Sequence, residues 1–194
     1  MSNKGDRHFP TSYGTFCAKK PNHHKKSAIT ALNRFCARYR LARSLCGISL
    51  DTYSAKATRT YTSMCSMFLA YTAYEVLLPG ARQLRVTGVE DIKTNVVLDS
   101  KLSTKLRANT KLQSFLLEHT RDADLKRKLK GFYKGSYDDI VCVAFAVRNL
   151  FSHGDLLTTD IGSGLASDRK LLDAVATRLL SYCDDKFTSC VRNL

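Results

Sequence analysis

Large side chains between residues 61 and 78 recur at the period of an α-helix. The intervals are 3, 4, 3, 4 and 3 residues, through Tyr61, Met64, Phe68, Tyr71, Glu75 and Leu78. Residues spaced in this way share one face of a helix. Because Glu75 alone interrupts the apolar character of this stripe, the pattern predicts a helix over residues 51–79 that packs against other helices.

The helical period recurs along most of the chain, and sustained alternation of period two, which marks a half-buried strand, does not occur. Residues 81–98 suit a loop or a short strand. At 194 residues and 44% hydrophobic content, the chain is long enough to bury a core. We therefore expect an all-α, up-and-down helical bundle. Its other helices are predicted over residues 27–47, 99–119, 122–132 and 137–152, with a last one from residue 167.

Positive charge is concentrated near the N-terminus. Residues 1–60 carry 12 basic and 2 acidic side chains, and so supply most of the formal net charge of +14. Residues 1–26 hold little apolar material, which predicts an irregular basic N-terminal arm before one helical domain over 27–194. Four of these basic residues are expected to form an outer helix face: Arg34, Arg38, Arg40 and Arg43. Such charge suits a polyanionic partner, whereas a solvated arm without a partner is an equally open interpretation.

The seven cysteines favour a reducing compartment. Their number is odd, and none belongs to a C-x-x-C pair. We interpret them as reduced structural thiols. The N-terminus lacks an apolar signal core, and the chain holds no uncharged apolar run long enough for a membrane span, so we expect a cytoplasmic protein without a membrane partner.

One constellation carries chemistry, at the end of the apolar segment 137–152. Arg148 and Asn149 precede His153, and the four-residue interval from Asn149 to His153 puts both on one helix face, where the amide can hydrogen-bond the imidazole. An arginine stabilises phosphate charge, and a histidine moves protons near neutral pH. The alternative is structural: a histidine in the last helical turn interacts well with the helix dipole, and an arginine pairs with a surface acid.

The segment Ala-Val-Arg-Asn-Leu-Phe-Ser-His-Gly, residues 146–154, resembles the R-x4–6-H signature of HEPN (higher eukaryotes and prokaryotes nucleotide-binding) domains. The expected order of helices is similar over about residues 27–190. The resemblance implies a compact bundle, often dimeric. Many members of that family are metal-independent endoribonucleases of toxin–antitoxin, abortive-infection and other host-conflict systems.

The resemblance also implies roles for residues. Arg148 would bind and polarise the scissile phosphate, and Asn149 would orient the histidine or the phosphate. His153 would act as general base on the ribose 2′-hydroxyl or as acid to the leaving 5′-oxygen, giving a 2′,3′-cyclic phosphate. Two motifs would meet across a homodimer interface in one composite cleft. Asp155 stands where some family members carry a tyrosine that accepts AMP, so silencing by that route is not expected.

Glu75 is a weaker candidate. A carboxylate within an apolar stripe needs a polar partner. Glu75 either faces the same cleft as Arg148, where it pairs with the arginine or helps proton transfer, or simply reaches water near the end of its helix. No histidine or cysteine has metal-ligand spacing, so neither a metal nor a cofactor is expected.

The leading hypothesis is thus a metal-independent endoribonuclease of a toxin–antitoxin or host-defence system, with RNA as substrate and an antitoxin or regulatory protein as a further partner. Two alternatives stay open. One is a non-catalytic HEPN-like module that binds RNA, a nucleotide or a partner protein. The other is a structural helical adaptor whose charge meets an acidic partner.

Overall fold

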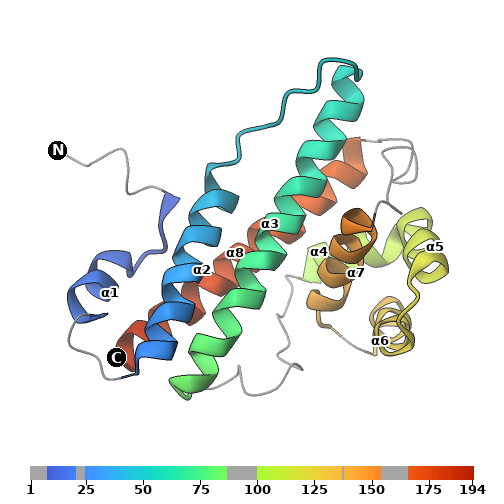
Figure 1. Ribbon diagram of the computed structural model, residues 1–194. Coiled ribbons are helices and arrows are strands. Elements are labelled where there is room, and N and C mark those ends of the chain that lie inside the picture. The colour runs from blue at the N-terminus through green and yellow to red at the C-terminus, as the bar shows by residue number, and fades with distance from the viewer. Residues whose placement is uncertain (1–7, 21–24, 87–99, 137, 154–165) are drawn as a thin grey trace.

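The computed structural model describes residues 8–20, 25–86, 100–136, 138–153 and 166–194. Within these ranges the chain forms eight α-helices and no strand, which confirms the predicted all-α bundle (Figure 1). The helices are α1 (Tyr13–Lys19), α2 (Lys26–Ser44), α3 (Ala55–Gln83), α4 (Ser100–Ala108), α5 (Thr110–His119), α6 (Ala123–Tyr133), α7 (Val141–Ser152) and α8 (Ala166–Arg192).

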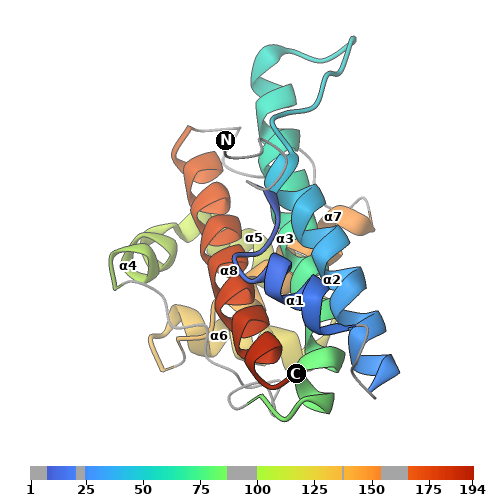
Figure 2. The same cartoon turned by 90° about the vertical axis from the view of Figure 1, so that its left-hand side faces the viewer.

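Helix α3 is the centre of the fold. It packs along α2 and α8, and α7 covers another part of its surface (Figure 1). Along the chain, α2, α3, α7 and α8 alternate in direction, as an up-and-down bundle requires. The short helices α5 and α6 pack against α7, whereas α4 contacts α8 and α6 (Figures 1 and 2). The largest fully buried side chains include Leu32, Phe35, Met64, Met67, Phe132 and Phe187.

Helix α3 does not end at Pro79 as predicted but continues to Gln83. The continuation is explained by packing against α2. A Cβ atom on Gly80 would lie 3.0 Å from a Leu32 methyl carbon and 3.3 Å from the Ala31 Cβ, so the glycine lets the two helices approach closely. The resulting burial offsets the cost of a proline inside a helix.

Two helix starts also differ from expectation. The predicted cap, Ser27, instead donates a hydrogen bond to Oε1 of Gln83 at 2.7 Å, and no side chain caps α2. Helix α3 begins after Ser54, whose Oγ accepts a hydrogen bond from the Ala57 amide at 3.2 Å. Hydroxyl residues suit both roles, and sequence alone does not separate them.

The described part of the N-terminal arm contains the short helix α1, where an irregular segment was predicted, and this helix lies against α8 and α2 (Figure 2). Thr11 donates to both carboxylate oxygens of Asp184, from its amide at 2.7 Å and its hydroxyl at 2.6 Å. The Phe16 ring is fully buried 5.5 Å from that of Phe187. These contacts attach residues 11–16 to the end of the bundle.

The helix predicted over 99–119 is two helices separated at Asn109. The Asn109 Oδ1 accepts a hydrogen bond from the Leu112 amide at 3.0 Å and so caps α5. Its Nδ2 donates to Asp168 of α8 at 2.7 Å. An asparagine side chain competes well with the helical backbone, which explains the break.

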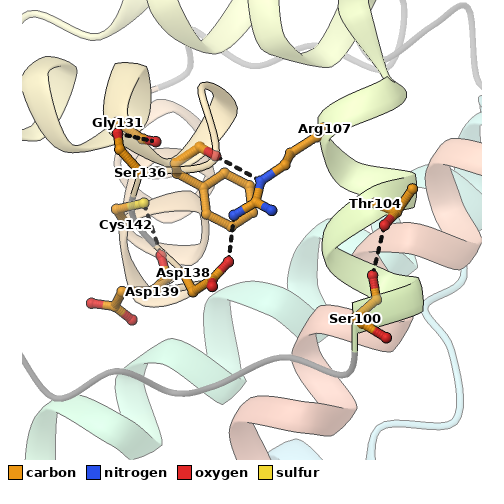
Figure 3. A network of polar contacts seen from close by, with 9 residues as sticks. Ser100, Thr104, Arg107, Gly131, Ser136, Asp138, Asp139 and Cys142 are labelled. Carbon is orange, nitrogen blue, oxygen red and sulfur yellow. Dashed lines mark hydrogen bonds and ion pairs between the residues drawn. The ribbon is translucent and has the colours of Figure 1, made fainter.

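Arg107 joins α4 to the connection between α6 and α7 (Figure 3). Its Nε donates to the Phe132 carbonyl oxygen at 2.8 Å, and Nη2 forms an ion pair with Asp138. Close by, Asp139 Oδ1 accepts from the Val141 amide at 2.9 Å. These contacts fix where α7 begins. Asp122 caps the start of α6, where its Oδ1 accepts a hydrogen bond from the Leu125 amide at 2.7 Å.

The seven cysteines are free thiols, as predicted, and four of them are buried. No helix in the described ranges is long and apolar enough to cross a membrane. Most of the predicted loop or strand over 81–98 lies outside the described residues. The segment from Gly154 to residue 165 lies outside them entirely.

Candidate functional site

The motif residues lie at the C-terminal end of α7. His153 is the residue that ends the helix, and its amide donates to the Asn149 carbonyl oxygen at 3.0 Å. Arg148 and Asn149 are half-buried, whereas His153 is exposed. The three residues therefore lie at an accessible edge of the bundle.

Arg148 is held by contacts on two helices. Nη2 lies 3.3 Å from Oε2 of Glu75 on α3, and Nη1 donates to Oδ1 of Asn149 at 2.9 Å. The guanidinium carbon lies 5.8 Å from the centroid of the Tyr71 ring, which stacks on Phe145 at 5.4 Å. A planar cation over an aromatic face is a favourable arrangement. The guanidinium is therefore positioned before any ligand binds.

The Arg148 Nε–H group is buried and has no hydrogen-bond partner in the described structure. Leaving such a donor unpaired is costly, and the cost is about 1–3 kcal/mol for a typical polar group. One of the hydrogen-bond donors of Arg148 is therefore unused in the described structure.

Glu75 combines the two alternatives weighed from sequence. It pairs with Arg148, and its side chain is still 37% exposed, against 28% for the arginine. Ion pairs with this much solvent contact contribute about 0–1 kcal/mol. A phosphate oxygen can therefore displace the carboxylate from Arg148 at little cost.

The predicted hydrogen bond between Asn149 and the His153 imidazole is absent from the described structure. The amide oxygen instead accepts from Arg148, and the hydrogen bond that joins Asn149 to His153 runs between their backbones. The His153 backbone keeps helical dihedral angles, so the missing bond reflects the pairing of the Asn149 amide with the guanidinium of the adjacent Arg148. Asn149 thus orients the arginine.

Two cavities flank α7. One of about 430 Å³ is lined by Glu75, Tyr71 and Phe145, together with residues of α6. The other, of about 200 Å³, is lined by Asn149 and His153. Asp122 and Leu125, at the start of α6, contribute to both cavities. Asn149 and His153 therefore share the second cavity with side chains that the sequence analysis did not select as candidates.

His119, Thr120 and Arg121, at the end of α5 and just beyond it, line the cavity that contains His153. From sequence, His119 had no partner at ligand spacing. The only signal was its position in the last turn of an amphipathic segment, three residues before the Asp122 cap. Which helix ends meet in space depends on tertiary packing and cannot be read from spacing.

A third and larger cavity, of about 1120 Å³, lies between α4 and α8. Leu102, Leu171 and Ala174 provide its apolar lining, and Asp168 is its one acidic residue. Its cationic lining residues are Lys101, Lys105, Lys111, Lys170 and Arg178. The Asn109–Asp168 hydrogen bond joins the two sides of this groove. We call it the α4–α8 groove.

No group of three or more histidine, cysteine or acidic side chains in the described ranges is arranged to hold a metal ion. Comparison with known proteins adds no relatives: no family model matches the chain, and no curated protein or solved structure shows significant similarity to it. The site is therefore interpreted from its own chemistry.

Proposed function

We propose that the protein is a metal-independent endoribonuclease in which Arg148 and His153 act on a phosphodiester of RNA. The observation that carries the proposal is the position of the guanidinium. Arg148 is held by Glu75 and Asn149, and Asn149 also lines the small cavity with His153. A fixed cation and an imidazole are the groups that attack by a ribose 2′-hydroxyl on its own phosphate needs, and here Asn149 lies between them on α7, in contact with Arg148 and lining the cavity with His153.

In this mechanism Arg148 binds the non-bridging phosphate oxygens, exchanging Glu75 for them, and stabilises the negative charge that grows in the transition state. His153 transfers a proton, either from the 2′-hydroxyl or to the 5′-oxygen. The 2′-oxygen bonds to phosphorus as the bond to the 5′-oxygen breaks, which leaves a 2′,3′-cyclic phosphate and a 5′-hydroxyl. Glu75 and Asn149 act as positioning residues for Arg148.

The distribution of charge supports RNA as the substrate. Arg34, Arg38, Arg40 and Arg43 are exposed on α2, and five cations line the α4–α8 groove. Such surfaces attract the phosphate backbone independently of its sequence. A role in a toxin–antitoxin or host-defence system, and a homodimer with a composite cleft, stay predictions from the HEPN resemblance.

One observation favours the second candidate, a non-catalytic RNA- or nucleotide-binding module. In the described structure Arg148 is already paired with Glu75, and no hydrogen bond orients the His153 imidazole. A binding module has no need of an oriented imidazole.

The test is incubation with total RNA in EDTA, comparing the wild type with His153→Ala. The matched control is His8→Ala, which removes an imidazole that hydrogen-bonds the Arg43 carbonyl oxygen away from the site. We expect cleavage to cyclic-phosphate ends by the wild type and the control alone. RNA binding without cleavage by any of the three, with all folded, would establish the binding module instead.

A further inference from the structure

The 200 Å³ cavity beside α7 contains two histidines from distant parts of the chain. His119 comes from the last turn of α5, and His153 ends α7. Arg121 and Asn149 also line it. Asp122, its acidic residue, accepts a hydrogen bond from the Leu125 amide as the cap of α6. The cavity therefore combines two proton-transfer groups with an arginine and an amide.

The orientation of His119 is fixed by two contacts. Nδ1 lies 3.0 Å from the Phe115 carbonyl oxygen, and the imidazole stacks on the Phe115 ring with centroids 4.3 Å apart. Because a carbonyl oxygen only accepts hydrogen bonds, the proton of the neutral imidazole resides on Nδ1. Nε2 then carries the lone pair, as a general base requires.

A second observation independently indicates a ligand. Thr120 lines the same cavity and is only 5% exposed, yet its hydroxyl oxygen has no hydrogen-bond partner in the described structure. A buried hydroxyl is costly to leave unpaired. Hydrogen bonding to the oxygen of a bound molecule would satisfy it.

The cavity size limits what this molecule is. Pockets for drug-sized ligands measure about 300–1,000 Å³, so one of about 200 Å³ holds a smaller group. A tetrahedral phosphate with its attached ribose suits a small space lined by imidazoles, an arginine and a hydroxyl. A purine base stacked within it does not, since the described lining contains no aromatic ring besides the imidazoles.

We propose that this two-histidine pocket binds one phosphate of the RNA chain and that His119 is the second proton-transfer residue of the site, so that acid and base come from one protomer. The inference rests on the ribonuclease function proposed above. Nε2 of His119 takes the proton from the 2′-hydroxyl, and the 2′-oxygen bonds to phosphorus. The bond from phosphorus to the 5′-oxygen breaks, and the imidazolium of His153 protonates the leaving oxygen.

The first experiment measures cleavage of a short RNA oligonucleotide in EDTA across a range of pH. Loss of one general acid or base typically costs about 10²–10⁴ in rate. We expect His119→Asn to lose activity on that scale while staying folded, because the asparagine amide keeps a donor for the Phe115 carbonyl. The wild-type profile should be bell-shaped, with His119→Asn losing the dependence on a deprotonated base and His153→Ala losing the dependence on a protonated acid.

The second experiment detects binding without catalysis. Titration with inorganic phosphate, followed by NMR of the imidazole protons, should shift His119 and His153 and leave His8 unchanged. Thr120→Val, which keeps the shape and removes the hydroxyl, should weaken the binding several-fold.

The outcomes separate the two proposals. Full activity of His119→Asn in an active enzyme would overturn the role of His119 and leave the ribonuclease function standing. Inactive wild-type protein would end both catalytic assignments, and the phosphate titration would then decide whether the pocket binds an anion. Activity regained on mixing His119→Asn with His153→Ala would place the two histidines on different protomers, and so contradict a site within one chain.

Discussion

The Glu75 carboxylate lies 3.3 Å from Nη2 of Arg148 and joins the last third of α3 to the C-terminal half of α7. This contact does two things. It holds the guanidinium against the Tyr71 ring, and it neutralises the charge that a phosphate would otherwise meet. Glu75 therefore competes with the proposed substrate for the same N–H groups.

Replacing Glu75 by Gln should strengthen RNA binding. The amide keeps a hydrogen-bond acceptor for Arg148 but removes the competing charge, so the affinity rises and the salt slope of binding steepens by about one phosphate contact. The free energy of unfolding should change by less than about 1 kcal/mol, because both side chains of the pair contact solvent. Fluorescence anisotropy at several salt concentrations measures the binding. The control is Asp173→Asn, which makes the same change of charge at an exposed position of α8. An RNA affinity of Glu75→Gln below that of the wild type would contradict the competition between Glu75 and RNA for Arg148.

The α4–α8 groove should contribute to RNA affinity. Reversing Lys105 and Lys170 together should weaken binding by about tenfold or more, which is about 1.4 kcal/mol. Both residues line the groove. The control reverses Lys130 and Lys134, which are exposed at the end of α6 and do not line it. Equal losses in the two double variants would mean that only net charge matters.

Gly80→Ala should destabilise the fold by about 1–3 kcal/mol, because the new methyl group would press on the fully buried Leu32. The matched control is Gly14→Ala in α1, where a Cβ would meet nothing within 4 Å. That change should be neutral or stabilise by up to about 1 kcal/mol, since alanine favours helix. Urea unfolding of both variants makes the measurement. Equal midpoints would refute the close approach of α2 and α3.

Asn109→Asp should destabilise the protein, although aspartate is an equally good helix cap. The substitution replaces the amide that donates to Asp168 at 2.7 Å with a second carboxylate, which repels the first. We expect a loss of about 1–3 kcal/mol in the free energy of unfolding. Adding Asp168→Asn should restore much of the loss by exchanging donor and acceptor. A double variant no more stable than Asn109→Asp would argue against the contact.

Stability should fall at alkaline pH. Burial raises the pKa of the Cys36, Cys142 and Cys190 thiols from the ordinary 9.0 to about 12. The folded state therefore holds these protons more tightly than the unfolded state does, so their contribution is complete below about pH 9 and is lost as pH rises toward 12. The urea midpoint, measured at intervals above pH 7, should decline beyond pH 9. Cys46→Ser, at an exposed thiol, should follow the same curve as wild type.

The sequence predicted the fold class because large apolar side chains recur at the helical period along the chain. The stripe itself is not the buried face of α3: only Met64 and Tyr71 of it are buried, and the buried face includes Met67, Tyr74 and Leu77. Helix ends were less predictable. Pro79 and Asn109 both favour the end of a helix. At Pro79 the close packing of Gly80 against α2 lets the helix continue, whereas at Asn109 a hydrogen bond to Asp168 of α8 supports the break. The two motif residues Arg148 and Asn149 were found to lie together because they are adjacent on one helix. His119 was missed because it comes close to His153 only when α5, α6 and α7 pack against one another.

Helix α5 has the α4–α8 groove at its N-terminal end and the two-histidine pocket at its C-terminal end. Its ten residues span about 15 Å. For the RNA ligand proposed above, α5 thus sets the spacing between the two cavities: a mononucleotide would reach one of them, and only an oligomer would reach both. The chain length of that ligand, rather than its base sequence, would then be the first determinant of how much of the surface it contacts.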